Sequence, residues 1–252
     1  MYLAAGLISL AAGFLSGLFG IGGAILTTPA IRCLLGFSGL IALGTPLPAV
    51  IPTTISGAYV YYRSGHLRVK TGLTCGLAGS CSALLGAAIT QYLGGEIMMF
   101  ITSGFILLVA LRFAMDGNKT RSKSDGESAG RLTTERTIII GLGAGFLAGF
   151  LGIGGGVVLV PALVILLGLR MHEALGTSLM AISIYAIPGS IEHYVLGHVN
   201  LQLLVPIVIG CVLGAQIGAR FAIRVRERRL KKGFSVFLAA VAVFLAVFEF
   251  FM

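Results

Sequence analysis

The sequence has 252 residues, of which 57% are hydrophobic and only 11% are charged, and its formal net charge is +9. A soluble globular domain carries roughly 25% charged residues, so this composition excludes that class and indicates a membrane protein. The positive charges lie in short stretches between apolar segments, which favours a role in membrane topology over nucleic-acid binding.

Eight apolar segments follow one another along the chain. A helix needs about 20 mainly apolar residues to cross a bilayer, and most of the segments reach that length. Segment 97–111 reaches it if the helix continues to Met115 and Arg112 snorkels to the interface. The sequence therefore predicts an all-α polytopic membrane protein. The segments are 1–31, 33–62, 71–95, 97–111, 137–169, 174–191, 199–219 and 233–248.

The chain repeats itself in one constant register, which aligns Gly13 with Gly145 and continues to about Ala87, aligned with Ala219. Residues aligned in this register are called equivalent below. The stretch "GFLSGLFGIGGAILTTPAI" begins at Gly13, its near copy "GFLAGFLGIGGGVVLVPAL" begins at Gly145, and "ALGT" follows each of them. One register held over so many positions indicates a duplicated unit of four segments. We predict a first repeat at 1–115, a flexible cytoplasmic linker at 116–136 and a second repeat at 137–252.

Charge predicts how the two repeats are oriented. If all eight segments are single spans, Lys and Arg divide nine against nine between the two sides, which violates the positive-inside rule. If 1–36 and 137–168 instead enter the membrane and return as hairpins, 17 of the 18 basic residues lie in the cytoplasm and only Arg32 lies outside. Three further crossings per repeat then make the repeats inverted, with both termini outside the cell.

The glycines near the middle of each hairpin predict a break in the helix. Non-helical backbone persists at membrane depth only where protein or water covers it, and a resuming helix presents free N–H groups to an anion. Inverted-repeat transporters bind substrate at such breaks. Close helix packing, the alternative role for glycine, suits "GFLSG" and "GFLAG" better than adjacent glycines. The predicted substrate-binding breaks are Gly20, Ile21, Gly22 and Gly23, and Gly152, Ile153, Gly154, Gly155 and Gly156.

Several polar residues lie near the predicted site. Thr45 and Thr177 hold equivalent positions, and each either caps a helix or donates its hydroxyl to an oxyanion, with Ser178 as a further donor. Glu192 and His193 end the sixth segment, where ionisable groups suggest proton coupling; anchoring at the membrane interface is the alternative. No nucleophile–base pair, metal-ligand cluster or nucleotide-binding loop stands out, so we expect no enzymatic activity, no metal and no cofactor.

These motifs resemble the sulfite exporter TauE/SafE family, also called the toluene sulfonate uptake permease family. The resemblance lies in "GIGGAILTTPAI" and "GIGGGVVLVPAL", in "ALGT" after each, and in the glycine-rich third segments. It implies a secondary transporter in the cell membrane that exports sulfite, thiosulfate or organosulfonates. Members often carry an acidic residue where this chain has Arg68 and Asn200, which puts the role of that acid in doubt here.

Three functions remain open at this point. A secondary transporter with alternating access is favoured by the repeat, the breaks and the resemblance. The alternatives are a passive anion channel on the same fold and a membrane-bound assembly or regulatory partner. The expected partners are a small anionic substrate, a coupling proton or sodium ion and the lipid bilayer, with no nucleic acid; a homodimer is left open.

Overall fold

The structure is all-helical. The computed structural model describes residues 2–24, 26–28, 31, 39–90, 104, 108, 134–151, 155–195, 197 and 199–251, and every regular element within these residues is an α-helix. The fourth predicted segment, apart from Gly104 and Leu108, and most of the predicted linker fall outside them. In chain order the helices are α1 (Tyr2–Phe19), α3 (Gly39–Gly44), α4 (Pro46–Arg63), α5 (Val69–Thr90), α7 (Thr134–Leu151), α8 (Gly156–Ile165), α9 (Met171–Val195), α10 (Leu201–Arg224) and α11 (Glu227–Phe251).

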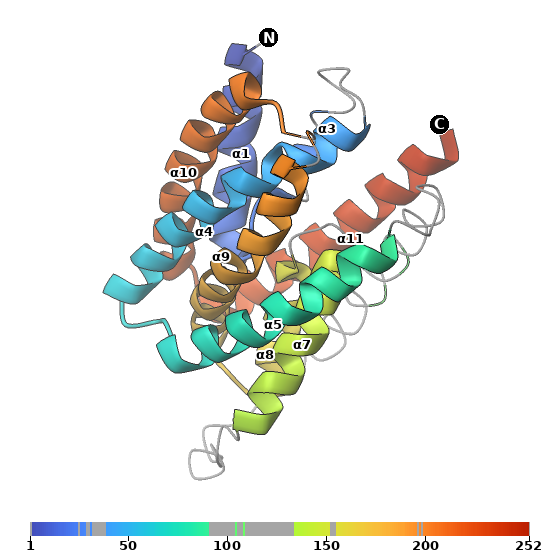
Figure 1. Cartoon of the computed structure of the whole chain (residues 1–252). Helices are drawn as coiled ribbons and strands as arrows, with labels where there is room; N and C mark the ends of the chain where they lie inside the picture. The colour runs from blue at the N-terminus through green and yellow to red at the C-terminus, as the bar shows by residue number, and fades with distance from the viewer. Residues whose placement is uncertain are drawn as a thin grey trace.

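Helix α9 lies at the centre of the bundle, where it contacts α1, α3, α4, α5, α8 and α11 (Figure 1). Its residues 174–191 carry no charge, and Leu175, Leu179 and Ile182 are completely buried. An uncharged, largely apolar helix of this kind is stable when other helices surround it. The helix begins at Met171, ahead of the predicted segment 174–191, so that a charged first turn precedes the apolar part.

Two helix pairs, α1 with α10 and α5 with α7, make the closest backbone contacts of the bundle. A Cβ atom at Gly13 would collide with the Cys211 backbone, and one at Gly145 would collide with the Gly79 backbone. Small residues at such interfaces let apolar helices approach closely and gain dispersion energy. The glycines of "GFLSG" and "GFLAG" therefore have the close-packing role that their spacing favours.

The two helix pairs make the same contact twice, with the roles of the two halves of the chain exchanged. In the register of the repeat, Cys211 is the equivalent of Gly79, as Gly145 is of Gly13. A second set repeats the exchange one turn further along, where Gly17 meets the backbone of Ala215 and Gly149 meets that of Ala83. Each pair thus takes one helix from each half, so that neither half packs as an independent unit.

The outer surface of the bundle is apolar along α5 and α10. Exposed apolar side chains recur at every fourth position of α10, and α5 has them at equivalent positions. Exposed apolar surface of this extent suits lipid better than water. Among the described helices, α9 over Met171–Ile191 and α10 over Leu201–Arg224 are long and apolar enough to cross a bilayer. The exposed residues are Leu201, Val205, Ile209, Leu213, Ile217 and Phe221 on α10, and Val69, Leu73, Leu77 and Leu85 on α5.

Candidate substrate-binding site

The first helical hairpin breaks at the predicted glycines. Helix α1 ends at Phe19, and Gly20, Gly22 and Gly23 have φ angles of +69°, +85° and +83°. This left-handed region carries a steric penalty for any residue with a Cβ atom. Helical structure resumes at Ala24, and the first N–H groups of a helix have no acceptor within it. The break therefore presents backbone donors at a buried position.

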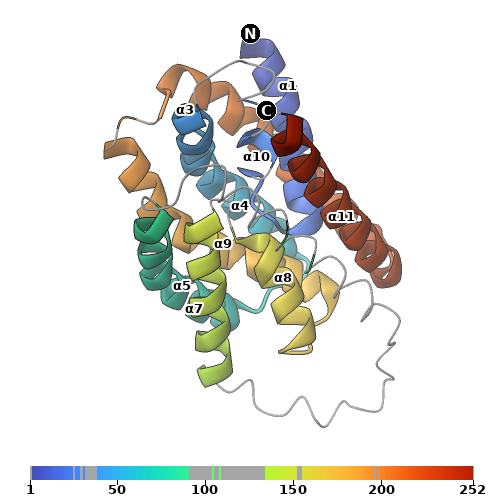
Figure 2. The same cartoon turned by 90° about the vertical axis from the view of Figure 1, so that its right-hand side faces the viewer.

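The second break has the same hydrogen-bonding pattern. Gly155 has a φ angle of +66°, and its carbonyl accepts the N–H groups of Val158 and Leu159 at 3.2 and 3.0 Å. The carbonyl of Gly23, the equivalent of Gly155, accepts those of Leu26 and Thr27 in the same way. Helix α8 then runs back beside α7 (Figure 2). Gly152, Ile153 and Gly154 lie outside the described residues.

The two breaks meet inside the bundle. A Cβ atom at Gly156 would lie 2.5 Å from both the Gly20 oxygen and the Ile21 Cα. A Cβ atom at Gly22 would contact Ile182 at 3.2 Å and Val50 at 3.4 Å. Val50 and Ile182 are themselves equivalent residues of the two repeats. The first break is thus enclosed by matching residues of both halves and by the start of α8.

The predicted site residues around this meeting point are inaccessible to solvent. Ile21, Thr45, Thr177 and Ser178 all have an exposed fraction of 0%. The Ser178 hydroxyl donates to the Gly20 carbonyl at 2.9 Å and also lies 2.8 Å from the Leu175 carbonyl. Ser178 therefore ties the first break to the central helix α9.

The two predicted threonines make reciprocal hydrogen bonds between the halves. Thr45 Oγ1 accepts the N–H of Asn200, and Thr177 Oγ1 accepts the N–H of Arg68, each at 3.1 Å. Asn200 is the equivalent of Arg68, as Thr177 is of Thr45. Neither threonine caps its own helix, because Thr45 has no side-chain capping bond and Thr177 lies inside α9. Each hydroxyl that accepts a bond still has its own proton to donate.

Arg68 and Asn200, at equivalent loop positions, have different roles in the two halves. Asn200 caps α10, with its Oδ1 accepting the N–H groups of Gln202 and Leu203 at 3.1 Å. A carboxylate would provide the same acceptor at an N-cap. The Arg68 side chain has no acceptor atom, and its guanidinium instead donates to Glu173 on α9.

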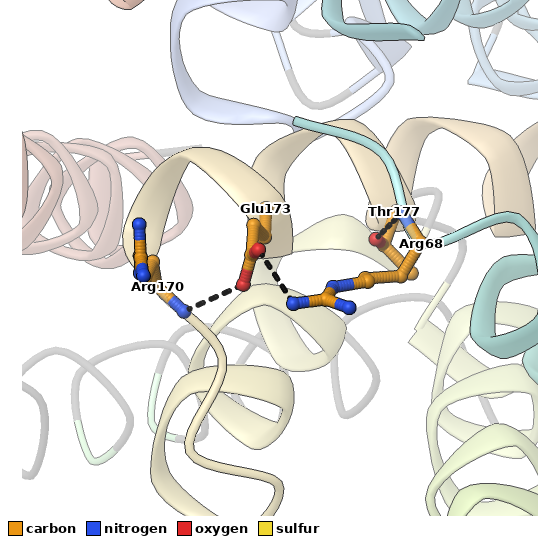
Figure 3. Close-up of polar contacts among 4 residues, drawn as sticks. All are labelled: Arg68, Arg170, Glu173 and Thr177. Atoms are coloured by element: carbon orange, nitrogen blue, oxygen red, sulfur yellow. Dashed lines mark hydrogen bonds and ion pairs between the residues drawn. The ribbon is translucent and has the colours of Figure 1, made fainter. Parts of the chain in front are cut away.

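An ion pair reinforces the contact between the α4–α5 loop and α9 (Figure 3). Arg68 Nη2 lies 2.9 Å from Glu173 Oε1, and Glu173 Oε2 accepts the N–H of Arg170 at 3.4 Å. The guanidinium is half-exposed whereas the carboxylate is mostly buried. Sequence reasoning missed this pair because its members are 105 residues apart and no sequence pattern links Arg68 to Glu173.

The start of α9 also binds the junction between α10 and α11. Glu227 Oε1 accepts the Met171 N–H at 2.9 Å, and His172 Nε2 lies 3.1 Å from the carbonyl oxygens of Ala222 and Val225. Together with the Arg68 pair, these bonds bring three basic stretches to one end of the bundle. The stretches are residues 63–70, Arg170 and residues 220–232.

Glu192 and His193 lie in the last turn of α9, and their side chains are outside the described part of the structure. Sequence reasoning also missed Ser16, a buried residue on α1 that lies beside the first break. Its equivalent in the second half is Ala148, so the repeat does not mark this position as polar in both halves.

Comparison with known proteins agrees with the membrane-embedded design. The chain matches the family described as Sulfite exporter TauE/SafE over residues 5–245. It is 31% identical over 209 residues to the probable membrane transporter protein YdhB of Bacillus subtilis (strain 168), covering 83% of this chain and 85% of that protein. It is 26% identical to a probable membrane transporter protein of Xylella fastidiosa (strain Temecula1 / ATCC 700964), covering 92% and 90%. No solved structure matches the chain.

The fold and these matches define a multi-pass membrane transporter rather than an enzyme. The chain belongs to the TauE/SafE sulfite exporter family.

Proposed function

We propose that this transporter exports small sulfur-containing anions, such as sulfite, thiosulfate or organosulfonates, and binds them between its two broken helices. One observation carries the proposal: Gly156 at the second break packs against the backbone of Gly20 and Ile21 at the first. Two helix starts that meet in a buried centre give an anion several N–H donors at once. The family description supports sulfite as the substrate class.

The proposed architecture consists of two inverted repeats, 1–115 and 137–252, joined by the linker 116–136. The exchange of contacts supports it, because Gly13 with Cys211 and Gly145 with Gly79 are the same contact made in both directions. Reciprocal contacts between equivalent surfaces are typical of a twofold relation. In inverted-repeat transporters such an axis lies in the membrane plane and passes near the substrate.

We further propose that the end of the bundle with the three basic stretches faces the cytoplasm. The bond from Arg68 to Glu173 supports this orientation. If every segment were a single span, residues 63–70 would lie on the side opposite to Arg170 and residues 220–232. The Arg68–Glu173 bond is therefore the contact that favours the hairpin topology over single spans, whereas the Met171–Glu227 bond is compatible with both. The start of α1 and the end of α11 lie towards the other end of the bundle (Figures 1 and 2), which agrees with outward-facing termini.

Burial of the meeting point favours alternating access over a passive channel. Ile21, Thr45 and Thr177 are completely buried, so that an anion reaches the breaks only if the halves move apart on one side at a time. The hydrogen bonds accepted by Thr45 and Thr177 join the two halves at equivalent positions. The ion pair of Arg68 with Glu173 strengthens the contact made by Thr177. We propose that these contacts close the two entrances alternately.

In this proposal the backbone N–H groups at the two breaks are the first contacts of the anion. Thr45 and Thr177 contribute hydroxyl protons, and Ser178 holds the Gly20 carbonyl away from the negative charge. Glu192 or His193 carries the coupling proton, since ionisable groups within the membrane are typically functional and the imidazole is the side chain that exchanges protons near neutral pH.

A thermal-shift screen of the purified protein tests the substrate class. We expect sulfite, thiosulfate and an organosulfonate such as sulfoacetate to raise the melting temperature with saturable dependence on concentration, because ligands that bind only the folded state stabilise it. Sodium chloride at matched ionic strength is the control. Stabilisation only by neutral or cationic compounds would contradict the proposed anion site.

A further inference from the structure

We propose that Ser16 is a substrate-binding residue, whose hydroxyl donates a hydrogen bond to the oxyanion held at the first break. The inference rests on the proposed function and adds to it a side-chain donor that belongs to one half only. It also predicts that the two halves contact the substrate unequally, with the negatively charged group at the Gly20–Gly23 break.

Ser16 is buried but has no hydrogen-bond partner. Its exposed fraction is 0%, and its Oγ finds neither donor nor acceptor among the described residues. A buried hydroxyl left unpaired costs stability, so that native proteins normally satisfy it. The usual solution in a helix is a bond to the carbonyl four residues earlier.

Other buried hydroxyls of this bundle follow that usual solution. Thr53 donates to the Ala49 carbonyl at 2.6 Å, and Thr54 donates to the Val50 carbonyl at 2.8 Å. Ser190 does the same towards Ala186 at 2.7 Å. The Ser16 hydroxyl is therefore an exception among buried helical hydroxyls, and a bound ligand would supply the missing acceptor.

The position of Ser16 fits such a ligand. It lies one turn before the break, and its own carbonyl accepts the Gly20 N–H at 2.7 Å. A Cβ atom at Gly23 would lie 3.5 Å from Ser16 Cβ and 3.7 Å from Ser16 Oγ. The Ser16 hydroxyl therefore lies directly beside Gly23, the residue that precedes the resuming helix. An oxyanion bound to the Ala24 N–H, at the start of the resuming helix, would thus be close to the hydroxyl.

The second half lacks this donor. The equivalent of Ser16 is Ala148, and a Cβ atom at Gly155 would meet Ala148 Cβ at 2.6 Å and Tyr185 Oη at 2.5 Å. The methyl group and the phenol ring thus fill the space beside the second break that would correspond to a ligand position. Beside Gly23 at the first break, by contrast, a Cβ atom would meet its nearest neighbours at the ordinary contact distances of 3.5 Å and more, and the unused donor of Ser16 lies next to it.

Ser16→Ala, with Ala148→Ser as the matched variant in the other half, tests the assignment. Binding of sulfite and of sulfoacetate is measured on the purified full-length proteins, together with the melting temperature without ligand. We expect Ser16→Ala to weaken binding about tenfold or more, the effect of losing a hydrogen bond to a charged group. Its ligand-free melting temperature should stay equal or rise, because an unpaired buried hydroxyl is removed. Ala148→Ser should not strengthen binding.

The outcomes separate this inference from the function on which it rests. If the wild-type protein binds neither probe, the proposed function and the assignment fail together. If the wild type binds and folded Ser16→Ala binds equally well, only the assignment fails. A large drop in the ligand-free melting temperature with unchanged affinity would show that Ser16 is structural. Ser16→Cys, which keeps the shape but has a weak donor, should bind with intermediate affinity.

Discussion

Replacing Gly156 by alanine should force the two breaks apart. The new Cβ atom would lie 2.5 Å from the Gly20 oxygen and the Ile21 Cα, whereas ordinary contact begins at 3.4 Å. Both neighbours are backbone atoms, so that one break must move by about 0.9 Å, the difference between these two distances. Gly156 is the first residue of α8 and is not among the positive-φ glycines, so alanine fits its backbone and the effect is steric.

Overpacking of this kind typically costs about 1–3 kcal/mol. For a protein of this size each kcal/mol lowers the melting temperature by roughly 2–4 °C, so we expect a decrease of roughly 2–12 °C. The displaced donors should also weaken sulfite binding. Differential scanning fluorimetry in detergent, with and without sulfite, measures both effects.

Gly143→Ala is the matched control for this prediction. Among the described residues, no atom lies within 4 Å of a Cβ atom at Gly143, which is exposed within α7. Alanine there should leave stability unchanged or raise it by up to about 1 kcal/mol, because alanine favours a helix interior over glycine. If Gly156→Ala behaved like Gly143→Ala in both stability and binding, the two breaks would not meet as described.

Three further predictions concern the contacts around the site. Thr177→Val should destabilise the protein by about 1–3 kcal/mol, because the Arg68 N–H loses its acceptor. Thr177→Ser keeps the hydroxyl and is the control. Equal melting temperatures for the two variants would contradict the hydrogen bond from Arg68 to Thr177. Glu173→Gln should cost under about 1 kcal/mol at low salt and less at high salt, since its partner is half-exposed; a large, salt-independent loss would show a different role. The double variant Glu192→Gln with His193→Gln should abolish the pH dependence of sulfite flux in liposomes, and an unaltered pH profile would exclude these residues from coupling.

The main features of the fold could be predicted from sequence because they depend on local composition. Glycine at Gly20, Gly22 and Gly23 allows φ angles that other residues rarely adopt. The register of the repeat aligns Gly23 with Gly155 and so places the second break. The spacing of Gly13 and Gly17 likewise indicates close packing. Each of these signals is carried by residue type and by spacing, either within a short stretch of the chain or in the constant register of the repeat.

The remaining features depend on contacts between distant residues, which one sequence does not reveal. Thr45 and Thr177 were predicted near the site, but their partners come from the opposite half. The Arg68–Glu173 pair joins two residues that no sequence pattern links to each other. The donor role proposed for Ser16 depends on the place of its side chain beside Gly23 and on the absence of a hydrogen-bond partner among the described residues, and the repeat carries no equivalent serine.

A counterflow assay tests whether sulfite is transported through a buried site at the two breaks. Proteoliposomes preloaded with unlabelled sulfite are diluted into buffer containing a trace of radiolabelled sulfite, and uptake of the label is followed over time. A carrier whose buried anion site opens to one side at a time should accumulate the label transiently above equilibrium, and Gly143→Ala should do so as well, whereas Gly156→Ala should be strongly impaired. Uptake that never exceeds equilibrium, or equal overshoot by Gly156→Ala and the wild type, would contradict transport through a site at the two breaks.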